Sequence, residues 1–379
     1  MSDTRVAVDL LYLTGKRGGT ETYARQLLPR MAALLPEVEL VGLTNTLGRE
    51  AVERWFPGPL HTLRLSGDNR PVWAAAETFV VDRLAARGGA DLMWCPANFG
   101  PRARRTPTLV TVHDVIAWDF PNPEVSRVTQ AVTSGIIGRA ARSATRLLTG
   151  SEDARDAITR VLGVPASRIT VVPHGSADPR PGVDVAAEMA GLGLADGRPT
   201  VLSTGNRMPH KNYDGLLRAL ALIPAERRPR LVVTGSHGED PLAPVVAELG
   251  LEADVVLLGW VTADQLEALY QSATLYACPS LAEGFGLPVI DAMKRGTPVL
   301  VADIGALREV GGDAARYASP TDPAAMAAGI EALLADPAER DRLRQAGLAR
   351  SAQFTWDRSA ELTADAVRRT LEDVAAARR

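Results

Sequence analysis

Short apolar runs alternate with longer stretches of helical periodicity along the whole chain. In the first half, the short runs predict strands at residues 6–10, 38–43, 92–95, 108–112, 146–149 and 169–172. The stretches between them predict helices at residues 20–34, 72–87, 125–144 and 152–162. Strands that alternate with helices in this way are typical of a parallel sheet with helices on both faces.

The second half repeats the alternation. Its strands are predicted at residues 200–203, 230–234, 255–258, 275–278 and 298–301, and its helices at residues 212–223, 241–249, 262–271, 288–295 and 323–335. We therefore expect an α/β protein with two doubly wound, Rossmann-like domains facing a central cleft. The predicted parts are an N-terminal domain at 1–178, a linker rich in Gly, Pro and Asp at 179–198, a C-terminal domain at 199–355 and a terminal helix at 356–379.

Composition narrows the class of protein. Hydrophobic residues make up 46% and charged residues 23% of the 379 residues, as in ordinary globular proteins. The longest nearly apolar stretch, residues 255–261, is far shorter than the ~20 residues of a membrane-spanning helix. Two distant cysteines and a start without a secretory pattern favour a cytoplasmic protein. The net charge of −3 gives no indication of a nucleic-acid partner, and only Lys16, Lys211 and Lys294 are lysines among 42 basic residues.

The segment 279–291, PSLAEGFGLPVID, follows a predicted strand and precedes a predicted helix. Gly284 and Gly286 allow a sharp turn and a close approach to a ligand, and the helix start supplies free N–H groups to an anion. Glu283 and Asp291 are carboxylates that bind sugar hydroxyls well. The same residues also suit an ordinary helix start, where an acid complements the helix dipole.

A second strand-to-helix loop, residues 203–213, contains Gly205, Asn206, Arg207 and Lys211. Two cations in a short loop suit a phosphate or a diphosphate, although a solvated surface loop is the alternative. The retention of Lys211 in an arginine-rich chain favours the phosphate.

Two weaker signals come from the first half. Gly18 and Gly19 open a helix after the first strand, but the loop matches neither the Walker pattern nor Gly-x-Gly-x-x-Gly. His113 and Asp114 end a central strand, where ligands of such sheets bind, and a purely structural histidine is the alternative. No histidine or cysteine stands at metal-ligand spacing, so no metal site is predicted.

Together these motifs resemble glycosyltransferase family 4, which comprises retaining enzymes of the GT-B fold. The resemblance rests on the segments Glu283–Asp291, Gly205–Asn212, Gly18–Gly19 and His113–Asp114, with further matches at 150–155, 171–175, 307–313 and 354–356. These matches span nearly the whole chain in the family's order. Two positions depart from the family pattern, because Asp291 replaces the usual Glu and His174 stands where Asn is commoner.

The resemblance implies an acceptor site on the N-terminal domain, a nucleotide-sugar donor site on the C-terminal domain, and no cofactor or metal. It also implies that the helix at 356–379 crosses back to the N-terminal domain. It implies that Arg207 and Lys211 bind the diphosphate, that Glu283 contacts the donor sugar, that Asp291 binds the ribose and that His113 lies near the reacting carbon. The predicted catalytic residues are Glu283, His113, Lys211 and Arg207. The predicted donor-binding residues are Gly18, Gly19, Gly205, Asn206, Arg207, Lys211, Glu283, Gly284, Phe285, Gly286, Leu287 and Asp291.

The function expected from the resemblance is metal-independent, retaining transfer of a sugar to a hydroxyl, with GDP-mannose as the expected donor. A glycan, a lipid-linked glycan and a small natural product remain open as acceptors, as do contact with the inner face of the membrane and the oligomeric state. The N-terminal residues considered for acceptor or membrane contact are Trp73, Arg102, Arg104, Arg105, Trp118 and Phe120. A sugar-nucleotide epimerase of GT-B shape and a non-catalytic nucleotide-sugar-binding protein are the alternatives.

Overall fold

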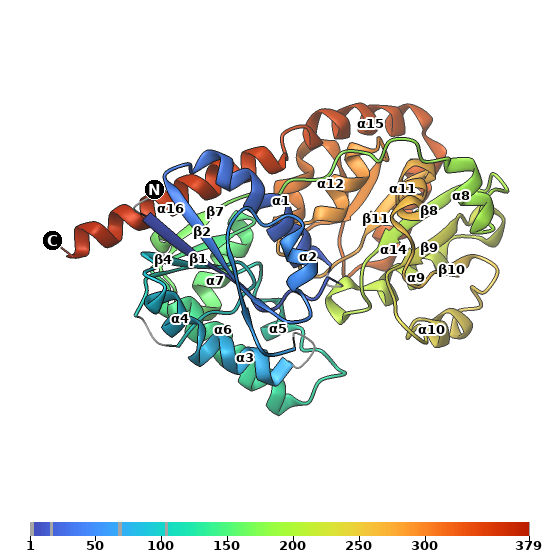
Figure 1. Ribbon diagram of the computed structural model, residues 1–379. Coiled ribbons are helices and arrows are strands. Elements are labelled where there is room, and N and C mark those ends of the chain that lie inside the picture. The colour runs from blue at the N-terminus through green and yellow to red at the C-terminus, as the bar shows by residue number, and fades with distance from the viewer. Residues whose placement is uncertain (1–3, 16–17, 67–69, 103–104, 379) are drawn as a thin grey trace. The chain divides into compact units, whose positions relative to one another are not determined.

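The computed structural model describes residues 4–15, 18–66, 70–102 and 105–378. The chain forms two units (Figure 1). The first contains the chain up to Gly175 together with Trp356–Arg379, and the second is Ser176–Thr355. The chain therefore returns to the first unit after completing the second.

The first unit is built on a seven-stranded parallel sheet in the order β3-β2-β1-β4-β5-β6-β7. Its strands are β1 (Thr4–Leu10), β2 (Val38–Asn45), β3 (Leu60–Leu63), β4 (Leu92–Cys95), β5 (Thr108–Thr111), β6 (Arg146–Thr149) and β7 (Ile169–Val171). The strand order reverses direction between β1 and β4, which is the switch point where ligands of doubly wound sheets bind. This places the ends of β1 and β5, and so the loops with Gly18 and His113, at one edge of the sheet.

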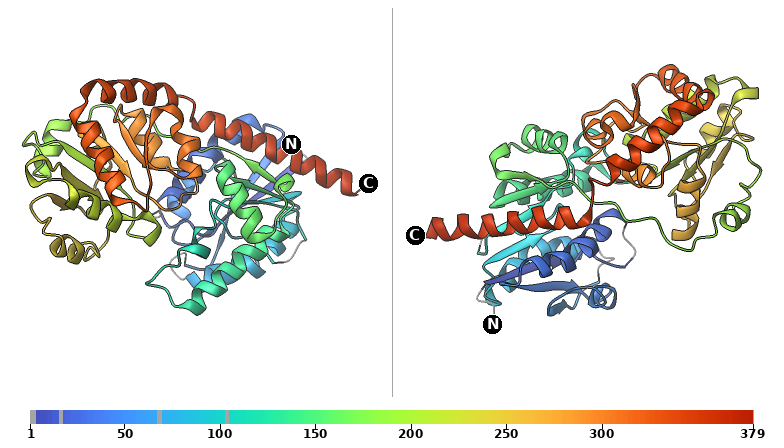
Figure 2. Two further views of the ribbon diagram at one scale, coloured as in Figure 1. Left: turned by 180° about the vertical axis from the view of Figure 1, so that it is seen from behind. Right: turned by 90° about the horizontal axis from the view of Figure 1, so that it is seen from above.

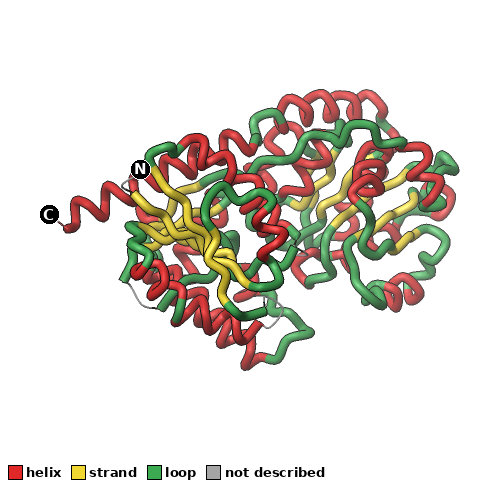
Figure 3. Tube along the Cα trace, in the orientation of Figure 1, coloured by secondary structure: helices red, strands yellow, loops and turns green. Residues whose placement is uncertain are grey.

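Helices pack on both faces of this sheet (Figure 3). They are α1 (Gly19–Leu34), α2 (Arg49–Glu53), α3 (Arg70–Phe79), α4 (Val81–Arg87), α5 (Ile116–Asp119), α6 (Arg127–Ser143) and α7 (Glu152–Leu162). Side chains of a strand alternate between the two faces. Val6, Val8 and Leu10 of β1 accordingly join one core cluster, whereas Ala7 joins the other.

The terminal helix α16 (Trp356–Arg378) completes one of these two cores. Trp356, Ala360 and Val367 are buried in the same cluster as Tyr23 and Leu27 of α1. Figure 2 shows α16 as the red helix lying beside the blue α1. Three ion pairs add to this apolar packing, joining Arg30 to Asp357, Arg368 to Glu37 and Arg146 to Asp373.

The second unit contains a six-stranded parallel sheet in the order β10-β9-β8-β11-β12-β13. Its strands are β8 (Thr200–Thr204), β9 (Arg230–Thr234), β10 (Val255–Leu257), β11 (Leu275–Cys278), β12 (Val299–Ala302) and β13 (Arg316–Ala318). Its helices are α8 (Val185–Gly191), α9 (Tyr213–Leu222), α10 (Ala243–Glu248), α11 (Ala263–Ser272), α12 (Leu287–Lys294), α13 (Gly305–Gly311), α14 (Pro323–Ala335) and α15 (Pro337–Ser351). Buried clusters lie on both faces of this sheet as well. The two sheets confirm the prediction of two doubly wound, Rossmann-like domains.

The structure corrects the predicted boundaries. Residues 179–198 are not an unstructured linker, because α8 lies within them, and Met189 of α8 and the following Leu194 are buried in the core of the second unit. The division falls at Gly175 instead of residue 178. The predicted helix at 72–87 is divided into α3 and α4 at Val80. The short strands β3 and β13 were not predicted, because neither shows the alternation of a longer half-buried strand.

Within the described residues, no helix is both long enough and apolar enough to cross a membrane.

Candidate active site

The loops that follow β8 and β9 approach each other closely in the second unit. The N–H of Gly205 donates to the carbonyl of Thr234 at 3.0 Å. Gly205 has φ +141° and Gly235 has φ +106°, a region that side chains other than glycine rarely adopt. A Cβ added to Gly235 would lie 2.7 Å from the oxygen of Gly205. The positive φ angles and this close approach of the two backbones therefore explain why glycine is present at 205 and 235.

Arg207 points into this pair of loops. Its Nη2 donates to the Asp240 carboxylate at 2.7 Å and its Nε donates to the same carboxylate at 3.1 Å. Its Nη1 donates to the carbonyls of Gly205 and Thr234 at 2.9 and 3.2 Å. The side chain is 6% exposed. The prediction that Arg207 reaches a diphosphate differs from this arrangement, because a guanidinium has five N–H donors and this one uses them to hold the loops.

Lys211 and Glu283 form the central charge pair of the site. The 3₁₀ turn η2 (Pro209–Lys211) carries the lysine, and Glu283 follows β11. Their Nζ and Oε1 atoms lie 2.7 Å apart, and the hydroxyl of Ser280 donates to the same oxygen at 2.7 Å. The two side chains are 17% and 9% exposed. The sequence did not indicate the part played by Ser280.

The two charges stabilise each other. Burial by itself would raise the pKa of Glu283, but Lys211 and the hydrogen bonds outweigh it and hold the pKa below its ordinary value. Burial by itself would lower the pKa of Lys211, but the Glu283 carboxylate beside it raises that pKa. The pair is therefore ionised at neutral pH, with a positive charge fixed beside the loop after β8.

Asn212 holds the Lys211 turn against the rest of the sheet edge. Its side-chain Nδ2 donates to the carbonyls of Pro279 and Pro320 at 2.9 and 2.8 Å. Its φ of +54° is one that asparagine tolerates better than most residues. Asn206, by contrast, is exposed, and its Oδ1 accepts a hydrogen bond from the N–H of Met208 at 3.4 Å.

The turn that follows Glu283 starts the helix α12. Gly286 has φ +113°, and a Cβ there would lie 2.8 Å from Cδ2 of Leu307. No side chain hydrogen-bonds to cap this helix start in the described part of the chain, and Leu287 and Pro288 form its first turn. The ring of Phe285 is buried and packs edge-on against Phe354, with centroids 5.8 Å apart. Phe285 thus anchors the turn from the core side. Pro288 has no N–H and the N–H of Val289 donates to the carbonyl of Gly286 at 3.0 Å, so the N–H of Leu287 is the one that the first three residues of α12 can offer to an anion.

Asp291 lies in the second turn of α12, beyond the first turn, where an acid complements the helix dipole. Ser176 donates a hydrogen bond to its Oδ1 at 2.5 Å. The Asp291 side chain keeps 31% exposure, and desolvation by the surrounding protein raises the pKa of its carboxyl.

His113 lies in the first unit, after β5. Its backbone N–H donates to Oδ1 of Asn98 at 2.7 Å, and its ring Nε2 lies 3.0 Å from the carbonyl oxygen of Pro96. Burial lowers the pKa of His113, so the ring is neutral at pH 7, with the proton on Nε2 and a lone pair on Nδ1. Tyr23 packs edge-on against it at 4.9 Å and His174 lies at 5.5 Å.

The aromatic residues around His113 were not predicted as site residues. Tyr23 lies on α1, His174 follows β7, and Trp356 at the start of α16 stacks on His174 at 6.3 Å. The only sequence signal was the departure of His174 from the commoner Asn. Among the residues considered for acceptor contact, Trp73 is buried against Phe99 and does not reach the surface. Arg104 lies outside the described residues.

Gly18 and Gly19 are exposed at the start of α1. Neither has a positive φ, and a Cβ added to either would meet no atom within 4 Å.

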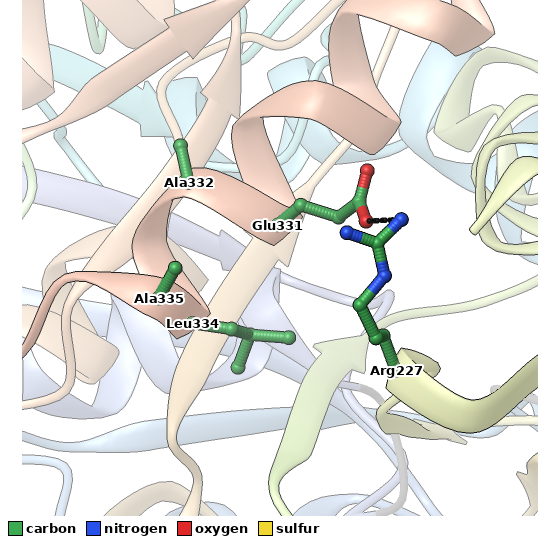
Figure 4. A pocket seen from close by; sticks show the side chains of 5 residues that line it. All are labelled: Arg227, Glu331, Ala332, Leu334 and Ala335. Carbon is green, nitrogen blue, oxygen red and sulfur yellow. Dashed lines mark ion pairs between the residues drawn. The ribbon is translucent and has the colours of Figure 1, made fainter. Parts of the chain in front are cut away.

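A surface pocket elsewhere on the second unit contains none of the predicted site residues. It is lined by Arg227, Glu331, Ala332, Leu334 and Ala335 (Figure 4). Its two charged side chains pair with each other at 3.2 Å. The pocket therefore offers no unpaired charge to a ligand.

Comparison with known proteins is consistent with this division into two units. A family model described as Glycosyltransferase Family 4 matches residues 17–176, and one described as Glycosyl transferases group 1 matches residues 184–350. A D-inositol 3-phosphate glycosyltransferase from Nocardia farcinica is 33% identical over 92% of this chain and 84% of its own length. The chain belongs to glycosyltransferase family 4.

Other relatives agree with this assignment. The O-antigen chain mannosyltransferase B of Escherichia coli is 33% identical to this glycosyltransferase over 74% of this chain and 75% of its own. Among solved structures, the sucrose-phosphate synthase of Thermosynechococcus elongatus has a TM-score of 0.74 at 21% identity and covers 98% of this chain and all of its own. HepE of Anabaena in complex with UDP-glucose has a TM-score of 0.71 at 20% identity, covering 96% and 99%. These structures show that the fold is that of GT-B glycosyltransferases.

Proposed function

We propose that this glycosyltransferase transfers mannose from GDP-mannose to a hydroxyl of a sugar or cyclitol acceptor, with retention of the anomeric configuration and without a metal ion. The observation that carries the proposal is the buried Lys211–Glu283 pair beside the uncapped start of α12. The choice of mannose is supported by two relatives, the O-antigen chain mannosyltransferase B and an MMP α-(1→4)-mannosyltransferase that is 32% identical over 63% of this chain.

The donor diphosphate would bind between the ammonium of Lys211 and the N–H of Leu287 at the start of α12. Both are fixed before the reaction starts, so they can stabilise charge that develops on the leaving diphosphate. In this proposal they supply the positive charge that a divalent cation provides in metal-dependent transferases. In this proposal Arg207 acts indirectly, because its side chain holds the shape of the loop after β8, which lies beside the diphosphate.

The other predicted site residues would contact the sugar, the ribose and the acceptor. Glu283 would accept hydrogen bonds from the donor sugar and stabilise positive charge at its anomeric carbon, and Asp291 would bind the ribose. His113 would present its Nδ1 lone pair to a hydroxyl of the sugar or the acceptor. Gly18 and Gly19 have no atom within 4 Å of an added Cβ and would leave room for close contact with the donor.

Transfer would proceed on one face of the sugar. The acceptor oxygen forms a bond to the anomeric carbon while the bond from that carbon to the diphosphate oxygen breaks. The acceptor proton passes to an oxygen of the departing diphosphate, so no protein base is needed. The new bond then has the configuration of the old one.

The acceptor is proposed to be carried on a lipid at the membrane surface. The support is the exposed apolar side of α6, where Val128 and Val132 are 74% and 57% exposed, and the exposed Arg102 and Arg105 in the same unit. Sedimentation with anionic vesicles would test this part separately. Recovery of all protein in the supernatant would contradict it.

The first test is calorimetric binding of GDP, UDP, dTDP and ADP in the presence of EDTA. We expect binding of GDP in preference to the others, and absence of binding to all four would contradict the proposal. Incubation with GDP-mannose and an acceptor then separates the remaining functions. A mannosylated product with retained configuration supports transfer, an altered nucleotide sugar indicates an epimerase, and binding without turnover indicates a non-catalytic protein.

A further inference from the structure

Asp291 is one methylene shorter than the glutamate that is usual in its family, and the structure provides it with a partner. The hydroxyl of Ser176 donates to Oδ1 of Asp291 at 2.5 Å, across 115 residues of sequence. Ser176 is the first residue of the second unit and is 4% exposed. A buried serine from the crossing segment therefore fixes one oxygen of a predicted ligand-binding carboxylate.

Ser176 is itself held in place by its backbone. Its N–H donates to the carbonyl of Phe354 at 3.1 Å, and its carbonyl accepts from Nζ of Lys294 at 3.1 Å. Lys294, one of the few lysines in the chain, also pairs with Asp178 at 2.8 Å. Ser176 and Asp178 therefore both contact Lys294 of α12, the helix that carries Asp291.

The second carboxylate oxygen of Asp291 is open. In the described part of the chain, no hydrogen bond is made to Oδ2, and the side chain is 31% exposed. Arg295 lies 3.9 Å from Oδ1 but directs its shorter contact, 2.7 Å, to Glu267. One oxygen is fixed and the other is available to a hydroxyl donor.

We propose that Ser176 is a positioning residue that holds Asp291 with Oδ2 directed toward the ribose hydroxyls of the nucleotide. This inference rests on the proposed function, in which Asp291 binds the ribose. A carboxylate that is already ordered loses less conformational entropy when a ligand binds. The hydrogen bond from Ser176 thereby compensates for the shorter side chain at this position.

The test compares a ribonucleotide with an analogue that lacks the hydroxyls. Calorimetry measures the affinity of wild type and Ser176→Ala for GDP and for 2′,3′-dideoxy-GDP. We expect Ser176→Ala to weaken GDP binding about five- to tenfold, the effect of losing one hydrogen bond. Binding of the dideoxynucleotide should stay at the wild-type level, because this ligand has no hydroxyl for Asp291 to accept from.

Two further variants separate positioning from general damage. Ser176→Thr keeps the hydroxyl and should restore GDP binding. Ser351→Ala removes another buried hydroxyl of the same unit, which donates at 3.0 Å to Leu348 in its own helix, and should leave both affinities unchanged.

Equal loss of both nucleotides in Ser176→Ala, or no loss of GDP, would overturn the proposal. Equal affinity of the wild type for GDP and its dideoxy analogue would also overturn it while leaving nucleotide binding intact. If the wild type binds another of the four nucleotides instead of GDP, that nucleotide and its deoxy analogue are used. If it binds none, the proposed function fails, which is a different result from failure of the positioning role.

Discussion

The ammonium of Lys211 and the carboxylate of Glu283 lie 2.7 Å apart, although 72 residues separate them in the chain. They meet because β8 and β11 are neighbours in the second sheet, so the loops that follow both strands emerge side by side. Ser280 and Asn212 then fix the geometry from either side. The two residues that the sequence offered as candidates from separate motifs thus form one charged centre.

Replacement of either member of this pair should abolish most transfer. Lys211→Met removes the positive charge proposed for the leaving diphosphate, and Glu283→Gln removes the negative charge proposed for the sugar. We expect each to lower kcat/KM by at least ~100-fold, as loss of a preorganised electrostatic group does elsewhere. Product formation from GDP-mannose, followed by mass spectrometry, measures the effect.

Stability must be followed in the same variants, because each single change leaves a buried charge without its partner. Such changes cost about 3–5 kcal/mol, whereas removal of both charges costs less. The double variant should therefore be more stable than Lys211→Met while remaining inactive. Arg218→Met is the control, since its exposed pair with Asp214 contributes little. Near-normal turnover in both single variants would contradict the assigned roles.

The buried pair of Arg207 and Asp240 should matter mainly for the stability of the second unit. Asp240→Ala leaves the 6% exposed guanidinium without a counter-charge, which should lower the free energy of unfolding by about 3 kcal/mol. Urea denaturation gives this value directly. The exposed Asp214→Ala should change it by less than ~1 kcal/mol. An unchanged unfolding midpoint in Asp240→Ala would show that this ion pair does not hold the loop.

His174 should make the first unit sensitive to acid. Burial, with a smaller effect from His113, lowers the pKa of His174 from 6.5 to about 3. Between these values the unfolded chain binds a proton that the folded chain does not, so stability is complete above about pH 6.5 and is lost as the pH falls toward 3. His174→Asn should remove this contribution, so the free energy of unfolding should fall less between pH 6.5 and pH 3, by up to a few kcal/mol.

Urea denaturation of wild type and His174→Asn at pH 7 and pH 5 measures that difference. The matched control is His61→Asn, because His61 is exposed on β3. We expect the control to decline with falling pH as the wild type does. An equal decline in all three proteins would mean that His174 does not set the acid sensitivity.

Much of the local structure around Glu283 was predictable because it is local in sequence. The segment 279–291 was predicted to follow a strand and to contain a sharp turn and a helix start, and the structure has β11 ending at Cys278 and α12 starting at Leu287. The parallel sheets were predictable for the same reason, since each strand and helix has its own period. The return of α16 to the first unit was expected from the resemblance to the family and is confirmed. Periodicity alone does not specify it, because it does not say which apolar faces meet.

Contacts across the chain explain what the sequence did not reveal. Arg207 was predicted to bind a phosphate because a cation in a glycine loop is typical of such a ligand, and that role stays a prediction. Its orientation in the structure is decided by Asp240 and by carbonyl groups of β9, which the sequence did not indicate. Trp73 looked like a surface aromatic but is buried against Phe99. In both cases the residue type indicates which ligands the side chain can bind, whereas the direction of the side chain depends on neighbours distant in sequence.

Gly286 should tolerate no side chain, and this prediction concerns the turn that presents the start of α12. Its φ of +113° is strained for alanine, and a Cβ would lie 2.8 Å from Cδ2 of Leu307. Gly286→Ala should cost about 1–3 kcal/mol of stability and reduce transfer, because the helix start must move to relieve the contact. Gly191→Ala on α8 is the control, with no atom within 4 Å of the added Cβ, and should be neutral or slightly stabilising. Equal unfolding midpoints and equal turnover in the two variants would show that the geometry of this turn does not position the proposed diphosphate site.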